Sequence, residues 1–330
     1  MACYYPMEAV KFYDGSVKVT GLLEDGTHSR RYLDDSNVKE FLQVPCGKCI
    51  GCRLEYSRQW AIRCMKELET TQGPSWFLTL TYDNEHLPRK VFEEDASGVR
   101  VAMPTLKPED LQNFVKRLRE KLRRRGHEDF RFFACGEYGD ELKRPHYHMI
   151  AFNLPLDDLE FYKSIRGHEY YNSKFLDDCW LNQGFVVASD VNFECCAYVA
   201  RYVMKKAKGP QGFSYASDNN IVEEFTRMSR RPGIGRAYYE LHKDEIYKKD
   251  NIGYMPTING PILLKPAKYY DKLYDVEYDI EAIREKRQAK SQKINFLKMS
   301  QTSVSSTEYR GILERDKEMQ TSLLKRELDI

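Results

Sequence analysis

Two short aromatic segments separated by a polar turn constrain the fold of this chain more than any other feature. Asp129–Cys135 (DFRFFAC) and Pro145–Asn153 (PHYHMIAFN) are short and rich in aromatic and apolar residues. Segments of this length and composition favour strands, and a polar connection between them favours antiparallel pairing. The sequence therefore predicts an antiparallel hairpin near the middle of the chain.

The segments around this hairpin alternate between strands and helices. Apolar residues recur at helical spacing in Leu54–Glu69 and Lys107–Arg125, whereas Trp76–Tyr82 and Gly184–Ala188 have the composition of buried strands. Phe193–Lys206 has the length and spacing of a further helix. The order β, α, β, β, α, β, α predicts an α+β domain of the split βαβ type. Its antiparallel sheet is backed by helices, and a doubly wound parallel sheet does not suit this order.

Four segments are expected along the chain. They are an N-terminal β meander with a cysteine cluster and a helix at 1–73, the α+β core at 74–210, a basic Gly- and Arg-containing extension at 211–273, and a charged helical tail at 274–330. Within the core, residues 157–180 have a mixed helical pattern. A Ser/Thr-rich stretch at 300–307 is expected to break the tail.

Composition excludes some classes of protein. The 330 residues carry 52 Lys and Arg against 50 Asp and Glu, so the net charge of +2 gives no global attraction to an acidic partner. No run approaches the roughly 20 apolar residues that a membrane span requires, and the first ten residues lack the pattern of an export signal. A cytoplasmic protein without a membrane partner is expected, and its nine cysteines fit a reducing compartment.

One predicted strand places two histidines on the same face. His146 and His148 are two residues apart, so they either hold one ion together or serve as stacking or core histidines. The hairpin brings Glu137 near them, unless Glu137 only pairs with Arg131 or Lys143 in the turn. Two imidazoles and one carboxylate suit Mg²⁺ or Mn²⁺ acting on a phosphate, although imidazole also suits Zn²⁺ and Fe²⁺.

Two tyrosines share one face of the predicted helix Phe193–Lys206. Tyr198 and Tyr202 are four residues apart, and a phenol near a cation is a competent nucleophile toward a phosphodiester. The alternative is that both rings only pack in the core. Tyr202 is favoured as the first nucleophile because Lys205 and Lys206 follow it by three and four residues.

A cluster of three cysteines precedes the first predicted helix. Cys46, Cys49 and Cys52 recur every three residues, and a tetrahedral zinc site would need a distal fourth ligand, for which Cys3 is preferred over Cys64. An iron–sulfur cluster fits less well, because position 56 carries Tyr instead of a further Cys. Inert or redox-labile thiols are the remaining interpretation.

Basic residues gather in three runs. Phe114–Arg131 holds eight Lys or Arg against three acidic residues, and Arg201–Lys208 and Arg227–Arg236 each hold four with no acidic residue. Such a run is often only a solvated helix face, but three runs flanking one site predict a groove that follows DNA phosphates. The residues expected to contact DNA are Arg123, Arg124, Arg201, Lys206, Arg230 and Arg231.

Together these motifs resemble the HUH endonuclease superfamily. FLTLTY at 77–82, HYH at 146–148 and YVARYVMKK at 198–206 occur in that order. The closer resemblance is to the replication initiation proteins of gokushovirus-like microviruses, small phages with single-stranded circular DNA. Its motifs are VPCGKCIGC (44–52), CGEYG (135–139), RPHYH (144–148) and SRRPGIG (229–235). The resemblance covers about residues 1–240 and not the tail. Tyr147, in the middle of the two-histidine motif, would point to the opposite face.

The resemblance implies an HUH-type core and a metal-dependent tyrosine DNA endonuclease and strand transferase. One tyrosine would attack a phosphodiester at the replication origin, become linked to the 5′ phosphate and free a 3′ hydroxyl for the host polymerase. A second tyrosine would resolve the round of rolling-circle replication. Mg²⁺ or Mn²⁺ at the active site, with a structural Zn²⁺ at the cysteines, would be the cofactors. Single-stranded or supercoiled origin DNA and the host replication helicase and polymerase would be the partners, in the bacterial cytoplasm.

Other functions remain open. A non-haem iron oxygenase also uses two histidines and one carboxylate, but it predicts a jelly roll with a distant second histidine. A non-enzymatic origin-binding or packaging protein would use the basic runs and keep the tyrosines in its core. An HUH transposase, relaxase or plasmid initiator would share the chemistry.

Overall fold

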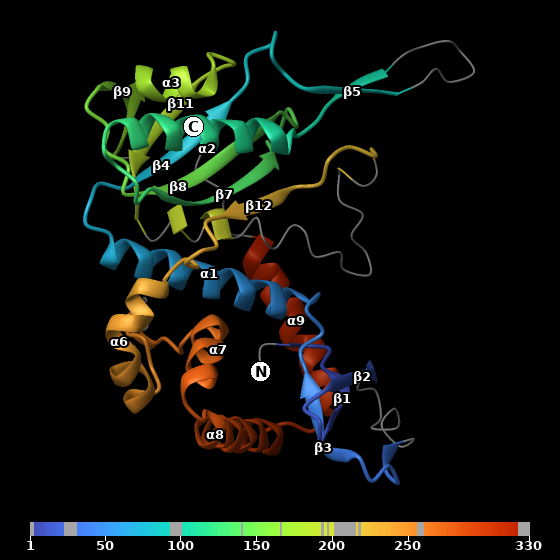
Figure 1. The fold of residues 1–330 in the computed structure, drawn as a ribbon. Helices are drawn as coiled ribbons and strands as arrows, with labels where there is room; N and C mark the ends of the chain where they lie inside the picture. Colours follow the sequence, from blue (N-terminus) through green and yellow to red (C-terminus); the bar gives the residue numbers. More distant parts are fainter. Residues whose placement is uncertain are drawn as a thin grey trace. The chain divides into compact units, whose positions relative to one another are not determined.

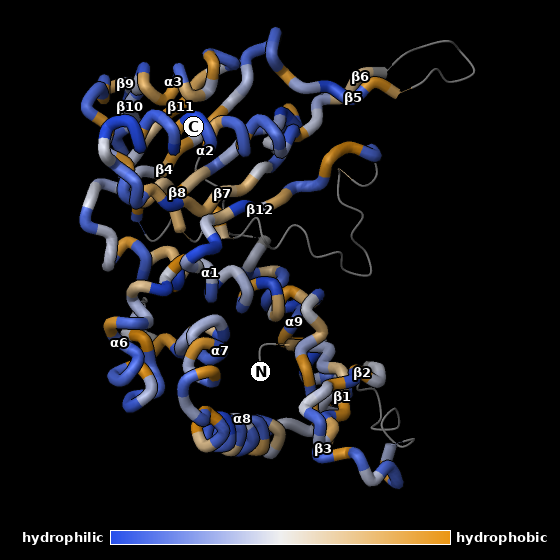
Figure 2. The backbone as a smooth tube through the Cα atoms, in the orientation of Figure 1, coloured by the Kyte–Doolittle hydropathy of each residue, from blue (hydrophilic) through white to orange (hydrophobic). Residues whose placement is uncertain are grey.

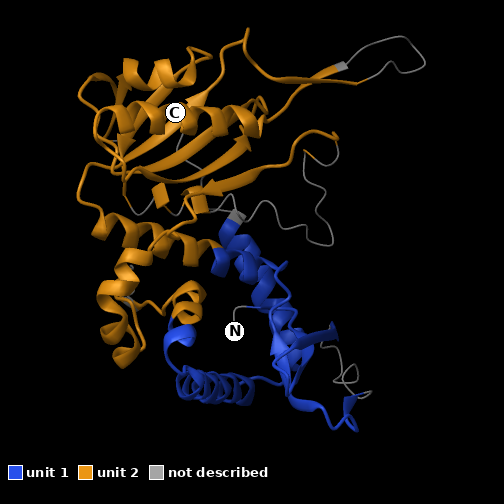
Figure 3. Ribbon diagram, viewed as in Figure 1, with its two compact units in different colours: residues 1–56, 274–330 blue, residues 57–273 orange. Residues whose placement is uncertain are grey.

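A computed structural model describes most of the chain. The described residues are 3–22, 32–92, 101–139, 141–165, 167–192, 195–196, 198–200, 216, 219–255 and 261–322. The chain divides into two compact units, residues 57–273 and residues 1–56 together with 274–330 (Figure 3). Both contain helices and antiparallel strands, so the α+β class predicted from the sequence is confirmed.

The larger unit is built on an antiparallel sheet that has seven strands among the described residues (Figure 1). The strand order is β12-β7-β8-β4-β11-β10-β9. The strands are β4 (Trp76–Thr81), β7 (Arg131–Tyr138), β8 (Pro145–Phe152), β9 (Leu159–Ile165), β10 (His168–Ser173), β11 (Val186–Asp190) and β12 (Phe225–Met228). The expected hairpin is β7 with β8, and it has a further strand on each side.

Helices cover both faces of this sheet. α2 (Pro108–Arg124) and α3 (Lys174–Trp180) lie over one face, and α1 (Ile50–Thr70) runs along the other (Figure 1). On the α1 side, the rings of Trp60 and Phe133 lie 4.8 Å apart. Because successive residues of a strand point to opposite faces, each strand contributes one set of side chains to each helical layer.

α2 shows why the sequence folds in this way. Its apolar residues fall on one stripe and are buried, while Pro108 at the first position needs no backbone donor. Lys121, Arg123 and Arg124 in the last turn complement the helix dipole. The stripe packs into a core whose members from both helices and sheet include Leu78, Leu80, Leu111, Phe114, Leu118, Leu122, Tyr147, Met149 and Trp180.

The mixed helical stretch expected at 157–180 is mostly wrong. The structure has the hairpin of β9 and β10 there, and only α3 is helical. β10 pairs with β11 and buries Tyr170, so the hairpin extends the sheet beyond β11. Ser173 then begins α3 by accepting a hydrogen bond from the backbone N–H of Leu176. Long-range pairing with β11 decides this segment, and local periodicity could not reveal it.

Several regular elements lie where the sequence analysis predicted none. β5 (Arg89–Phe92) pairs with β6 (Val101–Pro104) in the polar excursion after β4. Beyond the core, β12 joins the edge of the large sheet beside β7. It is followed by α6 (Arg236–Lys249), β13 (Tyr254–Met255), β14 (Ile262–Leu263) and α7 (Lys268–Glu277). The basic extension is therefore structured, and part of it belongs to the sheet.

The smaller unit contains a three-stranded sheet and the tail helices. β1 (Met7–Phe12) lies between β2 (Val17–Leu22) and β3 (Val38–Val44), so the expected meander, in which the second strand is central, is wrong. β1 takes the centre because it carries the fully buried Ala9 and Val10, whereas β3 alternates partly buried with exposed residues.

The tail forms α8 (Glu281–Ser300) and α9 (Ser306–Ser322), with the predicted break between them. α8 buries none of its residues, and Figure 2 shows hydrophilic residues along most of it. Across the described residues, no helix has the length and apolar character needed to cross a membrane.

Candidate metal centre and active site

The register of three neighbouring strands brings the two histidines and Glu137 together. Glu137 on β7 is the cross-strand partner of His146 on β8, and His148 stands opposite Thr79 on β4. Directly paired residues lie on the same face of a sheet. The strand β7 runs on to Tyr138, so Glu137 lies within regular structure instead of after its end.

Glu137, His146 and His148 form a tight cluster, called here the Glu-His-His cluster. Oε1 of Glu137 lies 2.7 Å from Nε2 of His146 and 2.9 Å from Nε2 of His148. Glu137 is 1% exposed and His148 is 2% exposed. One ligand atom from each residue lies within 4.8 Å of the others, which is the spacing of side chains that share one ion.

The electrostatics of the cluster favour an ionised carboxylate. Burial raises the pKa of Glu137, but hydrogen bonds and charge interactions with His146 and His148 outweigh that effect and lower the pKa to about 2. A buried carboxylate of this kind requires positive charge close by, supplied by an imidazolium or by a metal ion.

Hydrogen bonds on the far side of the rings orient the histidines. Nδ1 of His146 lies 3.1 Å from the carbonyl oxygen of Arg144, which can only accept, so Nδ1 carries the proton. Nε2 of His146 therefore meets the carboxylate either as the N–H of an imidazolium or as a lone pair that needs a cation between them. Nδ1 of His148 shares a hydrogen bond of 2.9 Å with the hydroxyl of Thr79. The donor set thus fits a divalent metal, with outer hydrogen bonds that hold the rings in place.

Tyr198 reaches the same carboxylate. Its hydroxyl donates to Oε1 of Glu137 at 3.1 Å, and its ring packs edge-on against His148 with the centroids 5.1 Å apart. Phe77 of β4 stacks on the other part of this group, 5.3 Å from the ring of His148. The structure therefore unites one of the two predicted tyrosines with the predicted metal ligands.

Comparison with known proteins gives a consistent answer. The family model for the replication-associated protein ORF2 matches residues 75–207, which include the Glu-His-His cluster and Tyr198. The replication-associated protein ORF2 of Spiroplasma virus 4 is 34% identical over 316 residues, covering 94% of this chain and 93% of that protein. The chain belongs to this family of phage replication-associated proteins.

Two further relatives carry the same description. The replication-associated protein VP4 of Bdellovibrio phage phiMH2K is 32% identical over 236 residues, or 70% of this chain and 67% of that protein. The replication-associated protein ORF4 of Chlamydia phage 1 is 33% identical over 258 residues, or 74% of this chain and 58% of that protein. No solved structure matches the chain.

The remaining residues of the predicted active site lie outside the described residues. Tyr202, Lys205, Arg201 and Lys206 all fall in 201–215, so their roles stay predictions. The described parts of the expected helix, residues 195–196 and 198–200, are helical. Tyr147 points away from the cluster, as expected, because its hydroxyl bonds to the backbone of Lys107 and to the Tyr82 hydroxyl.

The expected pairing of Glu137 with Arg131 is not found. Arg131 instead pairs with Glu67 of α1, and its Nη2 also donates to the carbonyl of Pro232 at 2.8 Å. The charge of Glu137 is thus directed to the histidines.

Two of the three basic runs do not flank the cluster, which corrects the sequence analysis. Arg123 and Arg124 belong to α2, on the sheet face opposite the histidines, and both pair with Glu120. Arg230 and Arg231 are exposed in the turn after β12, where Ser229 bonds to Phe132 near the start of β7. At about 3.3 Å per residue, Phe132 and Glu137 are roughly 16 Å apart along the strand. A strand's direction and face, which periodicity alone does not assign to a neighbour, decide these positions.

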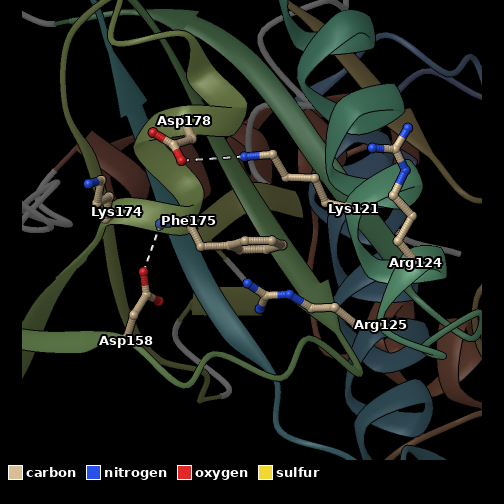
Figure 4. A pocket seen from close by; sticks show the side chains of 7 residues that line it. All are labelled: Lys121, Arg124, Arg125, Asp158, Lys174, Phe175 and Asp178. Atoms are coloured by element: carbon tan, nitrogen blue, oxygen red, sulfur yellow. Dashed lines mark hydrogen bonds and ion pairs between the residues drawn. The ribbon is translucent and has the colours of Figure 1, made fainter.

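A basic hollow that the sequence analysis missed lies between α2 and α3. It has a volume of about 410 Å³ and is lined by Lys121, Arg124, Arg125, Asp158, Lys174, Phe175 and Asp178 (Figure 4). The Arg125 guanidinium lies 4.1 Å from the ring centre of Phe175, and Lys121 pairs with Asp178 at 3.6 Å. The basic run on α2 gave half of this surface, but only the fold brings Lys174 to it.

The four predicted cysteines also come together. The sulfur atoms of Cys3, Cys46, Cys49 and Cys52 all lie within 4.8 Å of one another. Cys64, the alternative fourth ligand, is fully buried and does not belong to this group.

Proposed function

We propose that this protein is an HUH-type endonuclease that nicks one DNA strand at a replication origin through a 5′-phosphotyrosine intermediate, and so starts rolling-circle replication. The observation that carries the proposal is the hydrogen bond from the Tyr198 hydroxyl to Glu137, inside a cluster that also holds two histidines. Membership of a family of phage replication-associated proteins supports the biological role. We assign the nuclease core to residues 74–210.

Glu137, His146 and His148 would hold a divalent cation, Mg²⁺ or Mn²⁺. Such an ion supplies Lewis-acid stabilisation of the charge that develops on a phosphate under attack. Thr79 and the Arg144 carbonyl orient the two imidazoles for this task. Phe77 and the surrounding sheet keep the inner side of the cluster closed to water.

The nick is a substitution at phosphorus. The phenol of Tyr198 loses its proton, and its oxygen forms a bond to the phosphorus while the bond to the 3′ oxygen breaks. The leaving 3′ oxygen takes up a proton and becomes the hydroxyl from which a polymerase extends. The 5′ phosphate stays on the tyrosine, so the energy of the broken bond is kept for rejoining. Attack of a free 3′ hydroxyl on that phosphotyrosine reverses the steps.

A second tyrosine lets the cycle close within one subunit. Tyr202 would attack when Tyr198 still holds DNA, or the two would act in the reverse order, with Lys205 stabilising the phenolate. Arg123, Arg124, Arg201, Lys206, Arg230 and Arg231 are proposed to contact origin DNA, and the host helicase and polymerase, in the bacterial cytoplasm, to use the nicked product.

The experiment is covalent capture of single-stranded origin DNA in the presence of Mn²⁺, followed by denaturing electrophoresis. We expect a protein–DNA adduct from the unaltered chain and from each of Tyr198→Phe and Tyr202→Phe, Tyr202→Phe giving the lower yield. In Tyr198→Phe/Tyr202→Phe the adduct should fall by at least about 10³-fold while DNA binding persists. Tyr170→Phe, a buried tyrosine of β10 away from the cluster, is the matched control. An adduct from the double variant would place the nucleophile elsewhere. DNA binding without any adduct in the unaltered chain would favour a non-enzymatic origin-binding protein.

A further inference from the structure

The N-terminal cysteine and the cysteine-rich loop are brought together by strand pairing. Met7 at the start of β1 stands opposite Val44 at the end of β3. Cys3 therefore arrives beside the loop that carries Cys46 and Cys49, and Cys52 follows in the first turn of α1. Cysteines from distant parts of the sequence thus converge in the smaller unit.

The spacing of the sulfur atoms matches a single tetrahedral ion. The Cys46 and Cys52 sulfurs are 4.0 Å apart, and those of Cys3 and Cys49 are 3.9 Å apart. Four sulfurs at about 2.3 Å from one zinc ion lie about 3.8 Å from one another. A disulfide requires about 2.05 Å, and the four cysteines are free. An iron–sulfur cluster binds its cysteines on separate irons and so holds the sulfurs farther apart.

Backbone N–H groups point at these sulfurs. Cys46 N donates to Cys3 Sγ at 3.2 Å, and Tyr4 N donates to Cys49 Sγ at 3.4 Å. The backbone N–H groups of Lys48 and Cys49 both donate to Cys46 Sγ at 3.4 Å. Donors directed at sulfur stabilise thiolates, the form that binds metal. Gly47, with φ of 75°, permits the turn that aims two of these donors.

We propose that Cys3, Cys46, Cys49 and Cys52 bind a structural Zn²⁺ ion that closes the smaller unit. Four protein sulfurs fill a tetrahedral shell, so the ion has no position left for substrate and its role is architectural. The proposal is independent of the nuclease function, since the Glu-His-His cluster belongs to the larger unit.

The zinc centre also anchors the tail. Tyr5 is two residues from Cys3, and its hydrogen bond to Glu314 of α9 raises the pKa of the tyrosine to about 12. Glu314 is buried, although most of the tail helix around it is exposed. Fixing Cys3 therefore fixes the residues on which α9 rests, and zinc loss should loosen α9 before it affects the larger unit.

The test is metal analysis of the full chain purified without chelators. We expect about one zinc ion per chain, retained in His146→Ala/His148→Ala and in the control Cys64→Ala, and lost in Cys49→Ser. Cys46→His, which preserves four ligands, should keep the zinc and so separates ligand loss from misfolding. Cobalt substituted into the unaltered chain should show the strong visible absorption of a tetrahedral thiolate site.

A second readout follows the tail. Hydrogen exchange of α9 should quicken in Cys49→Ser, whereas exchange in the sheet of the larger unit should stay unchanged. Unaltered chain without zinc, zinc retained in Cys49→Ser, or bound iron with sulfide in place of zinc would each overturn the proposal.

Discussion

Glu137 shows how one buried charge organises the candidate site. Its carboxylate accepts from Tyr198 and faces both imidazoles, and it is almost closed to water. An ionised group in such a setting persists only if positive charge and hydrogen bonds replace its hydration. The same residue thus ties the metal ligands to the nucleophile, and replacing it tests both functions.

Glu137→Gln should lower adduct formation with single-stranded DNA by at least about 100-fold. Glutamine keeps the shape but removes the charge that binds a cation and accepts the tyrosine proton. The measurement is adduct yield across a Mn²⁺ titration. Glu141→Gln, in the exposed turn between β7 and β8, is the matched control and should behave like the unaltered chain. Equal yields from the two variants would remove Glu137 from the active site.

Thr79 tests the outer hydrogen bonds of the cluster. Thr79→Val leaves Nδ1 of His148 without its partner at 2.9 Å, so the Mn²⁺ concentration for half-maximal adduct should rise by about 10-fold or more. Thr81→Val is the control, since Thr81 is on the same strand and face but bonds to the Phe185 carbonyl. The maximal yield at saturating Mn²⁺ should change less than the midpoint. An unshifted midpoint would show that Thr79 does not position the ligand.

At the scale of elements, α1 and the turn after β12 are joined by one buried carboxylate. Glu67 of α1 pairs with Arg131 of β7 and accepts the backbone N–H of Gly235 at 2.6 Å. Arg63, one turn earlier, donates to the Ile234 carbonyl at 3.0 Å and lies against the Tyr269 ring. The SRRPGIG motif is thus held against α1 and the start of β7, and its arginines are presented from a fixed turn.

Glu67→Ala should lower the free energy of unfolding by about 3 kcal/mol, because it leaves a largely buried guanidinium and a backbone N–H without their acceptor. Glu69→Ala is the control two residues away. Glu69 pairs with Lys66 on the exposed side of the helix, where a loss below about 1 kcal/mol is expected. Urea unfolding of both variants gives the comparison. Similar losses from the two would mean that the Glu67 contacts add nothing beyond a surface ion pair.

At the scale of the whole molecule, charge is local and not global. The net charge of +2 cannot steer DNA, whereas the basic hollow on the α2 face and the turn at Arg230 and Arg231 concentrate positive charge in separate places. DNA that reaches the Glu-His-His cluster must therefore be guided by defined patches, and their contributions can be separated by salt dependence.

Arg230→Ala/Arg231→Ala should weaken binding of single-stranded DNA without regard to sequence. The slope of log affinity against log salt concentration should become shallower by about 1.4, or about 0.7 for each lost phosphate contact. Fluorescence anisotropy over a salt series measures it. Lys286→Ala/Lys290→Ala, which removes the same charge from the exposed α8, is the control. An unchanged slope in the arginine variant would exclude this turn from the DNA interface.

The sequence by itself determined what depends on neighbours along the chain. The period of two in β8, the short turn before it and the spacing of the cysteines predicted the hairpin, the grouping of Glu137 with both histidines, and the grouping of Cys46, Cys49 and Cys52. The period of 3.6 predicted α1 and α2. Each of these signals is local, because a strand or helix fixes the direction of a side chain relative to residues a few positions away.

Only the tertiary structure decided which elements became neighbours. β12 joins β7, and β10 joins β11, through backbone pairing whose sequence signal is weak. The same pairing makes β1 central in its sheet and turns α2, with its basic run, to the face away from the histidines. Sheet order and the choice of face follow from how all apolar surfaces are buried at once, which no single segment of the sequence encodes.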